Sequence, residues 1–291
     1  MFEGTLTALI TPFRNGAVDE PALRALIERQ IDAGIDGLVP CGSTGESATL
    51  SYAEHHRVVE ITIEAAAGRV PVIAGTGSNS TREAIDITQH AKQAGADGAL
   101  LLSPYYNKPT QEGIFLHYAA VAHETGLPIV VYNIPGRTAS NITPATIARL
   151  AQVENIVGVK ESSGDLDQIA HVVAACPDDF AVVSGDDALT LPLLAVGGKG
   201  VISTSSNVAP AQIADIVRRF QAGDTRGALE AHQSLLPLFD ALFCETNPIP
   251  VKAAVEALGL CDGEIRLPLT PITPPNLERL KMVMKELGIL S

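Results

Sequence analysis

Asp32-Ala-Gly-Ile-Asp-Gly-Leu-Val39 and Gln93-Ala-Gly-Ala-Asp-Gly-Ala-Leu100 are two similar stretches that indicate how this chain folds. In each, a glycine follows a helical pattern, as is common where helices end, and an Asp-Gly pair opens an apolar run. Gly68-Arg-Val-Pro-Val-Ile73 and Gly126-Leu-Pro-Ile-Val130 form a second such pair. These repeats predict a recurring step from helix to strand, and they support an architecture rather than a function.

Outward from these stretches, short apolar runs alternate with helical patterns along the chain. The candidate strands span residues 5–10, 37–41, 70–75, 98–102, 128–132, 156–160, 180–184 and 200–203. Between them, residues 20–33, 52–67 and 81–94 have apolar side chains at helical spacing. Near-continuous apolar strands are typical of a parallel sheet that is covered on both faces. The pattern therefore predicts an α/β fold, a (β/α)₈ TIM barrel.

After about residue 208 the strand signals stop, and only helical patterns follow. These helices are expected at residues 210–221, 225–243, 250–258 and 276–287. The first completes the eighth strand–helix unit, so we expect a barrel over residues 1–224 and a C-terminal helical region over 225–291. The alternative fold is a doubly wound open sheet. That fold needs a glycine-rich phosphate-binding turn after its first strand, which Thr11-Pro-Phe-Arg-Asn-Gly16 does not supply.

Composition narrows the classes of function. The net charge of −13 argues against nucleic acid and against anionic lipid surfaces as partners, because both attract basic patches. The four cysteines are scattered, which is typical of reduced thiols in a cytoplasmic protein. The N-terminal sequence lacks the basic region of a signal peptide, and no apolar stretch approaches a membrane span. We therefore expect a cytoplasmic globular protein.

The chemistry of such a barrel is expected at the carboxyl ends of its strands. The segments there are Thr11-Pro12, Gly42-Ser-Thr-Gly-Glu46, Thr76-Gly77, Ser103-Pro-Tyr-Tyr106, Tyr132-Asn-Ile-Pro-Gly-Arg137, Lys160-Glu-Ser162, Gly185-Asp-Asp187 and Ser203-Thr-Ser205. Hydroxyl groups, one arginine and one lysine thus converge on one face. Paired catalytic carboxylates and metal-ligand spacings do not occur among these segments. We expect no metal and no cofactor.

Lys160 is the most informative of these residues, because it closes the apolar run that begins at Ile156. Burial favours the neutral amine, which can attack a carbonyl carbon and form a Schiff base. Alternatively, Lys160 extends its charge to solvent at the strand tip or pairs with Glu161. Tyr132 ends the preceding strand, where its hydroxyl could relay protons to an imine. Its other interpretation is a tyrosine that caps the core.

The remaining polar residues at this face are less specific by themselves. Successive N–H groups in the Gly42-Ser43-Thr44-Gly45 turn could hold a carboxylate, although short loops of this composition are common. Arg137 can bind a carboxylate through two parallel hydrogen bonds, or form an ordinary surface ion pair. Tyr105 and Tyr106 could pack on a loop or contact a second subunit.

Over essentially its whole length, the chain resembles the dihydrodipicolinate synthase / N-acetylneuraminate lyase family. Eight segments in the family's order give this resemblance: Ala8-Leu-Ile-Thr-Pro12, Gly42-Ser-Thr-Gly-Glu-Ser-Ala-Thr-Leu50, Pro71-Val-Ile-Ala-Gly-Thr-Gly77, Pro104-Tyr-Tyr-Asn-Lys-Pro109, Tyr132-Asn-Ile-Pro-Gly-Arg-Thr138, Gly158-Val-Lys-Glu161, Ser184-Gly-Asp-Asp187 and Asn247-Pro-Ile-Pro-Val-Lys252. It implies a lyase that condenses pyruvate with L-aspartate 4-semialdehyde on the route to lysine and diaminopimelate.

The resemblance also implies roles for particular positions. Lys160 matches the imine-forming lysine, and Tyr132, Ser43 and Tyr106 match the proton relay, with Tyr106 contributed by a neighbouring subunit. The substrate-binding positions are matched by Thr44, Ile202 and Arg137, of which Arg137 holds the semialdehyde carboxylate. A feedback site for free L-lysine is matched by Ala48, His55, Asn79, Glu83 and Tyr105. The family expectation for assembly is a homotetramer, a dimer of dimers.

Two departures from the family pattern affect these expectations. Ser43 stands where the synthases usually have threonine, which keeps the hydroxyl but leaves χ1 less restricted. Gly-Ser-Thr-Gly-Glu is also commoner among the sialic-acid lyases, whereas Arg137 and Glu161 favour the synthases. Tyr52 replaces a histidine often found beside the lysine site. The rival functions are a lyase for N-acetylneuraminate or sugar acids, and a non-catalytic sensor of 2-oxo acids on the same barrel.

Overall fold

Eight parallel strands form one sheet in the computed structural model, which describes residues 2–290. The sheet order is β4-β1-β10-β9-β8-β7-β6-β5. The strands are β1 (Gly4–Ala8), β4 (Gly37–Val39), β5 (Ile73–Gly75), β6 (Gly98–Leu102), β7 (Ile129–Asn133), β8 (Ile156–Glu161), β9 (Ala181–Ser184) and β10 (Gly200–Ser203). A parallel bridge between Leu38 and Val72 joins β4 to β5, the two ends of this order. The predicted TIM barrel is confirmed.

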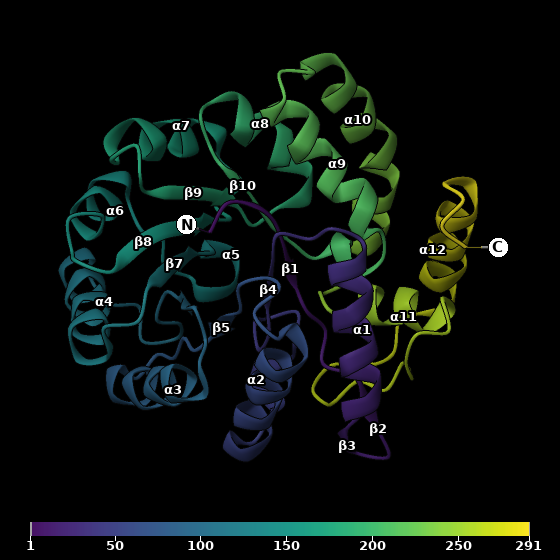
Figure 1. Ribbon diagram of the computed structural model, residues 1–291, viewed down its shortest axis with the longest axis horizontal. Coiled ribbons are helices and arrows are strands. Elements are labelled where there is room, and N and C mark those ends of the chain that lie inside the picture. The colour runs from purple at the N-terminus through teal and green to yellow at the C-terminus, as the bar shows by residue number, and fades with distance from the viewer. Residues whose placement is uncertain (1, 291) are drawn as a thin grey trace.

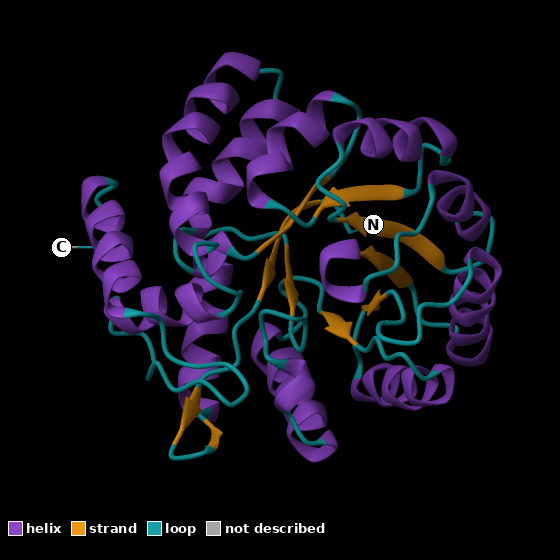
Figure 2. Cartoon of the chain, turned by 180° about the vertical axis from the view of Figure 1, so that it is seen from behind, coloured by secondary structure: helices purple, strands orange, loops and turns teal. Residues whose placement is uncertain are grey.

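Helices surround the strands as an outer layer (Figures 1 and 2). They are α1 (Glu20–Asp32), α2 (Tyr52–Ala66), α3 (Thr81–Ala94), α4 (Gln111–Thr125), α6 (Pro144–Leu150), α7 (Leu166–Ala175), α8 (Thr190–Ala195) and α9 (Pro210–Gln221). The short helix α5 (Pro135–Thr138) lies inside this ring instead. Aliphatic side chains fill both layers. One cluster lies inside the barrel, and a larger one lies between the strands and helices α1–α4 and α6–α8.

The two similar stretches perform the same structural task at the amino ends of β4 and β6. The Asp36 carboxylate accepts a hydrogen bond from the Thr5 N–H at 2.7 Å, and the Asp97 carboxylate accepts one from the Val72 N–H at 2.8 Å. The glycine two positions before each aspartate has a left-handed φ, +80° and +97°, which an L side chain rarely adopts. Each stretch thus ends a helix and fastens the next strand to its neighbour.

A small hairpin was not predicted from the sequence. Strands β2 (Phe13–Arg14) and β3 (Ala17–Val18) pair antiparallel, apart from the barrel strands (Figure 2). Asn15 and Gly16 form its turn with φ values of +54° and +82°, as hairpin turns of two residues require. Strands of two residues are too short for periodicity to reveal them, although the Asn-Gly pair is a hairpin signal.

The C-terminal part consists of α10 (Thr225–Leu242), α11 (Ile249–Ala257) and α12 (Pro274–Glu286), close to the expected bounds. Figure 1 shows them on one side of the barrel, with α12 outermost. One apolar cluster joins α9 to all three helices. Because this cluster spans residue 224, the boundary between the two predicted regions stays a prediction. No helix within residues 2–290 is long and apolar enough to cross a membrane.

Candidate active site

A small internal cavity of about 60 Å³ lies at the carboxyl ends of the strands. Five residues proposed from the sequence line it, namely Ser43, Thr44, Tyr132, Arg137 and Lys160. Ser43 and Thr44 follow β4, and Arg137 follows β7. Tyr132 and Lys160 belong to β7 and β8 themselves. Parallel strands in a barrel place these ends on one face, so residues far apart in the sequence meet there.

Lys160 and Tyr132 are direct neighbours across β7 and β8. The Lys160 Nζ lies 4.3 Å from the centre of the Tyr132 ring. Lys160 is 5% exposed and Tyr132 is 6% exposed, so both side chains are enclosed by the barrel. This burial does not fit the alternative in which Lys160 extends its charge to solvent at the strand tip.

Glu161 points away from Lys160, because successive residues of a strand face opposite sides of the sheet. Its carboxylate accepts hydrogen bonds from the Asn133 side-chain amide at 3.0 Å and from the Ser163 N–H at 2.7 Å. Burial raises the pKa of this carboxyl group, and these hydrogen bonds partly offset the effect. Since Glu161 is engaged on the outer side of the strands, the geometry does not support an ion pair between it and Lys160.

Gly185 follows β9 and approaches Lys160 closely. A Cβ atom built there would lie 2.6 Å from the Lys160 Cε and 1.9 Å from the Ser162 Oγ. Atoms do not approach so closely without displacing one another, so only glycine leaves the lysine side chain its present path. The sequence marked Gly185 as a strand-end residue, but nothing in the pattern predicted this contact.

The loop of residues 42–46 is held from several directions. The Thr11 hydroxyl donates to the Gly45 carbonyl at 2.7 Å. The Thr44 hydroxyl accepts a hydrogen bond from the Asn247 amide at 2.9 Å, and it lies 3.2 Å from the Thr204 hydroxyl. Asn247 and Thr204 also line the small cavity. The loop therefore presents its hydroxyl groups from a fixed backbone.

Arg137 lies in α5, the short helix that follows β7, at the exposed mouth of the cavity. Its Nη2 donates to the Asn247 carbonyl at 2.9 Å. This contact leaves other N–H groups of the guanidinium free to bind a carboxylate. Asn247 therefore touches both Thr44 and Arg137. Sequence reasoning placed it in a family motif but missed it as a site residue.

Two proposed residues lie outside the lining of the small cavity. Ile202 is 1% exposed and packs in the barrel interior together with Tyr132. Tyr106 is 89% exposed and has a left-handed φ of +70°. Its hydroxyl is thus presented to the outside of this chain. Phe243 is a lining residue that the sequence did not single out.

A larger cavity of about 610 Å³ adjoins the first and shares Ser43, Tyr132 and Arg137 with it. Four of the five residues proposed for lysine binding line this space: Ala48, His55, Glu83 and Tyr105. The fifth residue, Asn79, does not line this cavity. The Asn79 carbonyl accepts a hydrogen bond from the Asn107 side-chain amide at 2.9 Å.

Two of these residues already have partners. The His55 Nε2 lies 2.8 Å from the Gly75 carbonyl, and burial lowers the pKa of His55. The Glu83 carboxylate accepts hydrogen bonds from the Tyr52 and Ser78 hydroxyl groups. A carboxylate oxygen can accept more than one hydrogen bond, so Glu83 can also bind an ammonium group in this cavity. Within residues 2–290, no cluster of three or more His, Cys, Asp or Glu could hold a metal ion.

Known proteins match the chain over its full length. The family model described as the dihydrodipicolinate synthetase family matches residues 1–287. A 4-hydroxy-tetrahydrodipicolinate synthase of Syntrophus aciditrophicus is 58% identical over 290 residues and covers 100% of both chains. The solved structure of such a synthase from Methylacidiphilum fumariolicum is 50% identical, with a TM-score of 0.98 over 99% of this chain and 96% of that one.

Other solved structures are described with ligands or as an unusual assembly. The dihydrodipicolinate synthase of Acinetobacter baumannii, complexed with pyruvate, is 43% identical, with a TM-score of 0.98 and 100% of both chains covered. That of Cyanidioschyzon merolae, with lysine bound, is 44% identical, with a TM-score of 0.97 and 99% of both covered. A monomeric variant is 45% identical, with a TM-score of 0.98 over 99% of this chain and 98% of that one. This chain belongs to the dihydrodipicolinate synthetase family.

Proposed function

We propose that this chain is a lyase that condenses pyruvate with L-aspartate 4-semialdehyde to 4-hydroxy-tetrahydrodipicolinate, in lysine and diaminopimelate biosynthesis. The observation that carries this proposal is the buried Lys160 amine, 4.3 Å from the centre of the Tyr132 ring in a cavity at the strand ends. Full-length relatives are named for this activity. The chemistry needs a neutral amine, a proton relay and a group that binds a second carboxylate.

The reaction begins when the Lys160 Nζ attacks the C2 carbonyl carbon of pyruvate. Loss of water leaves a protonated imine, which withdraws electrons from the adjacent methyl group. Removal of a methyl proton gives an enamine, and the enamine carbon forms a bond to the aldehyde carbon of the semialdehyde. The amine of the semialdehyde then attacks the imine carbon. Ring closure breaks the bond to Lys160 and restores the free amine.

Each of these steps moves a proton, and the reacting amine lies 4.3 Å from the centre of the Tyr132 ring. We assign to its hydroxyl the proton transfers that expel water and form the enamine. Ser43, which lines the same cavity, passes these protons on. Tyr106 of a neighbouring subunit is the third member of this relay, which agrees with its exposed position here.

The two substrate carboxylates need separate positions. We assign the pyruvate carboxylate to the loop at Thr44, which lines the small cavity, because successive N–H groups in such a turn bind carboxylates. We assign Ile202, which packs in the barrel interior, to the wall that contacts the bound pyruvate. We assign the semialdehyde carboxylate to Arg137, because a guanidinium binds a carboxylate with two parallel hydrogen bonds. Its place at the cavity mouth lets the second substrate enter after pyruvate is bound.

Borohydride trapping tests the mechanism. Incubation with pyruvate and borohydride should add one reduced pyruvyl group, located by peptide mass analysis at Lys160. Lys160→Ala should trap nothing, and Lys160→Arg, which keeps the charge and most of the bulk, should trap nothing either. An adduct on Lys160→Ala, or none on the wild-type chain, would rule the mechanism out.

Steady-state assays separate this function from its rivals. We expect turnover with pyruvate and L-aspartate 4-semialdehyde, and none in the cleavage of N-acetylneuraminate or sugar acids. Arg137→Ala should raise KM for the semialdehyde while trapping of pyruvate persists. Trapping without turnover of any aldehyde would instead indicate the non-catalytic sensor of 2-oxo acids.

We further propose that free L-lysine binds in the larger cavity, where Ala48, His55 and Tyr105 would enclose it beside Asn79. Glu83 would pair with its ammonium group. Millimolar L-lysine should inhibit the wild-type enzyme, and Glu83→Gln should weaken this inhibition at least about tenfold, because it removes a charge-assisted hydrogen bond. kcat without lysine should change little. Unaltered activity of the wild-type enzyme in lysine would refute this part.

A further inference from the structure

A buried ion pair lies directly behind the loop that carries Ser43 and Thr44. Glu46 ends this loop, and its carboxylate is 2.6 Å from the Nζ of Lys252 on α11. Both side chains are only 1% exposed. Neither residue lines the small cavity that holds Lys160, so the ion pair is not part of the proposed chemistry itself.

Both charges have further partners. The Lys252 Nζ donates to the Glu264 carbonyl at 2.5 Å and lies 4.2 Å from the centre of the Phe13 ring. The second oxygen of Glu46 accepts from the Arg266 N–H at 3.2 Å. Such pairs contribute little net stability compared with well-packed apolar residues, because both ions lose their hydration. This buried, hydrogen-bonded pair is therefore better explained by the loop geometry that it maintains than by net stability.

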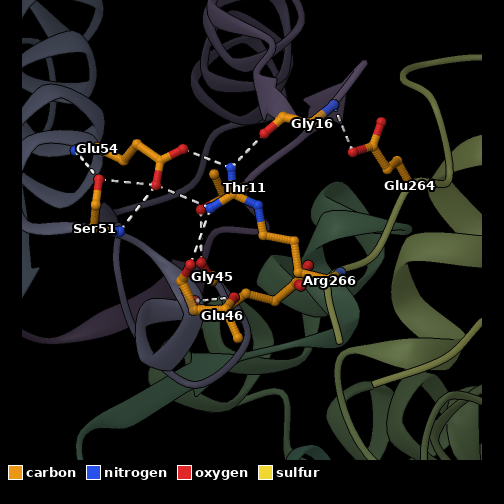
Figure 3. Close-up of polar contacts among 9 residues, drawn as sticks. Thr11, Gly16, Gly45, Glu46, Ser51, Glu54, Glu264 and Arg266 are labelled. Carbon is orange, nitrogen blue, oxygen red and sulfur yellow. Dashed lines mark hydrogen bonds and ion pairs between the residues drawn. The ribbon is translucent and has the colours of Figure 1, made fainter. Parts of the chain in front are cut away.

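The surroundings of Arg266 extend this attachment (Figure 3). Its guanidinium donates to the Thr49 carbonyl at 3.0 Å, to the Gly16 carbonyl at 2.8 Å and to the Glu54 carboxylate at 2.5 Å. The C-terminal segment thus reaches the hairpin, α2 and the loop that joins β4 to α2. In Figure 3 the side chain of Glu46 extends from the loop toward the backbone of Arg266.

The same helix also reaches the site from its amino end. Asn247, two residues before α11, donates to the Thr44 hydroxyl and accepts from Arg137. Lys252, within α11, holds Glu46, which is two residues after Thr44. The loop is therefore held at Thr44 by a residue just before α11 and at Glu46 by a residue within it. A shift of α11 would move the loop and Arg137 together.

The backbone of the loop explains why such support is needed. Glu46 has a left-handed φ of +54°, which is unfavourable for a residue with a side chain. Gly45 is packed against the chain, since a Cβ there would lie 3.1 Å from the Cys41 nitrogen and from the Leu9 carbonyl. A carboxylate anchored at Glu46 keeps the loop in a conformation that it would otherwise leave.

We propose that Glu46 and Lys252 are positioning residues: through their ion pair, α11 holds the loop of residues 42–46 so that Ser43 and Thr44 face the substrate bound at Lys160. This proposal rests on the proposed function for its catalytic consequence. Its structural consequence, a loop that is loosened when the pair is removed, is independent of that function.

The test uses the double variant Glu46→Gln/Lys252→Met in the full chain. It removes both charges together, so no unpaired ion stays buried, and the glutamine oxygen can still accept from the Arg266 N–H. We expect near-wild-type melting, a KM for pyruvate at least about tenfold higher and a rate of borohydride trapping lower by a similar factor, because displaced binding groups lose affinity and orientation. Deuterium exchange of the amides in residues 42–50 should be faster.

Val172→Ala is the matched control, because it removes buried apolar contacts on α7 without touching the loop. It should lower the melting temperature and leave the trapping rate unchanged. Glu46→Asp is a second variant for the case in which the double variant does not fold. It keeps both charges but withdraws the carboxylate by one methylene, and it should also slow trapping.

The outcomes are distinguishable. Folded variants that trap pyruvate within about twofold of the wild-type rate, with unchanged exchange in the loop, would overturn the positioning role, since misplacement costs far more. A wild-type chain that traps no pyruvate would overturn the proposed function. Deuterium exchange in the loop would then still test whether the ion pair holds the loop.

Discussion

Lys160 illustrates how much a single residue can do by its place in a strand. Its side chain points into the barrel, whereas that of the adjacent Glu161 points outward to Asn133 and Ser163. One position along β8 thus separates an amine in the cavity from a carboxylate in the outer layer. This alternation explains how a lysine and a glutamate can be neighbours in the sequence without pairing.

Ser43 tests the proton relay at the scale of one hydroxyl group. Ser43→Thr should keep kcat within about threefold of wild type, because it retains the hydroxyl and restricts χ1. In Ser43→Val the valine has nearly the shape of threonine but no hydroxyl. Here kcat should fall roughly a hundredfold or more, as expected when a proton-transfer group is lost. Steady-state rates at saturating substrates give the comparison. Equal rates for the two variants would show that the hydroxyl is dispensable.

Gly185 tests the space around the lysine. Gly185→Ala should lower kcat/KM at least about a hundredfold, because the added methyl group displaces the Lys160 side chain from its path. Pyruvate trapping at Lys160 should slow in parallel. Gly136→Ala is the control, since a Cβ there meets no atom within 4 Å. Wild-type trapping by Gly185→Ala would mean that Lys160 can take another path.

At the scale of elements, the ends of the strands bring the polar groups together. Tyr132 and Lys160 are paired by the register of β7 and β8, and Ser43 enters the same cavity from the loop that follows β4. The helices outside determine how firmly these ends are held. Helix α11 and the residue two positions before it hold the loop after β4, through Lys252 at Glu46 and Asn247 at Thr44.

Helix α4 gives the fold a pH dependence through His117. This side chain is 5% exposed, and burial lowers the pKa of His117 from 6.5 to about 4. Its neutral form is therefore favoured in the folded state, while the unfolded chain takes up a proton at higher pH. The resulting stability is complete above pH 6.5 and is lost as the pH falls toward 4, by about 3 kcal/mol for this shift.

Denaturant unfolding at several pH values between 7 and 4 measures this effect. His117→Gln should be less stable than wild type at pH 7 and should lose less free energy of unfolding on acidification. The Thr81 hydroxyl, 2.9 Å from the His117 Nδ1, can still bond to the glutamine amide. Parallel pH profiles for the two proteins would contradict the assignment.

At the scale of the whole molecule, one chain does not complete the proposed relay. Tyr106 is 89% exposed, and it does not line the small cavity of its own chain. We therefore expect at least a dimer in solution, with a homotetramer as the family expectation. Sedimentation velocity measures the assembly.

Subunit mixing tests the contribution of Tyr106 across an interface. Tyr106→Phe and Lys160→Ala should each be nearly inactive, and refolded mixtures of the two should regain activity. In a mixed pair, the site that has Lys160 would receive Tyr106 from the other subunit. No recovery in mixtures that mass analysis shows to contain mixed pairs would mean that Tyr106 acts within its own chain or not at all.

The sequence by itself determined the class of fold and the face on which the chemistry lies. Apolar periodicity, the repeated Asp-Gly steps and the polar residues at strand ends are local features, so they can be recognised without knowing what packs against them. They predicted the barrel and marked Lys160, Tyr132, Ser43 and Arg137. The hairpin was missed, because two-residue strands have no measurable period.

Only the tertiary structure decided which of these residues meet and what holds them. The contact of Asn247 with Thr44 joins positions 203 residues apart, and the Glu46–Lys252 pair joins positions 206 apart. Contacts of this kind depend on strand register, barrel closure and the docking of α11, to which no local pattern responds. The close approach of Gly185 to Lys160 has the same origin, because it exists only once β8 and β9 lie side by side.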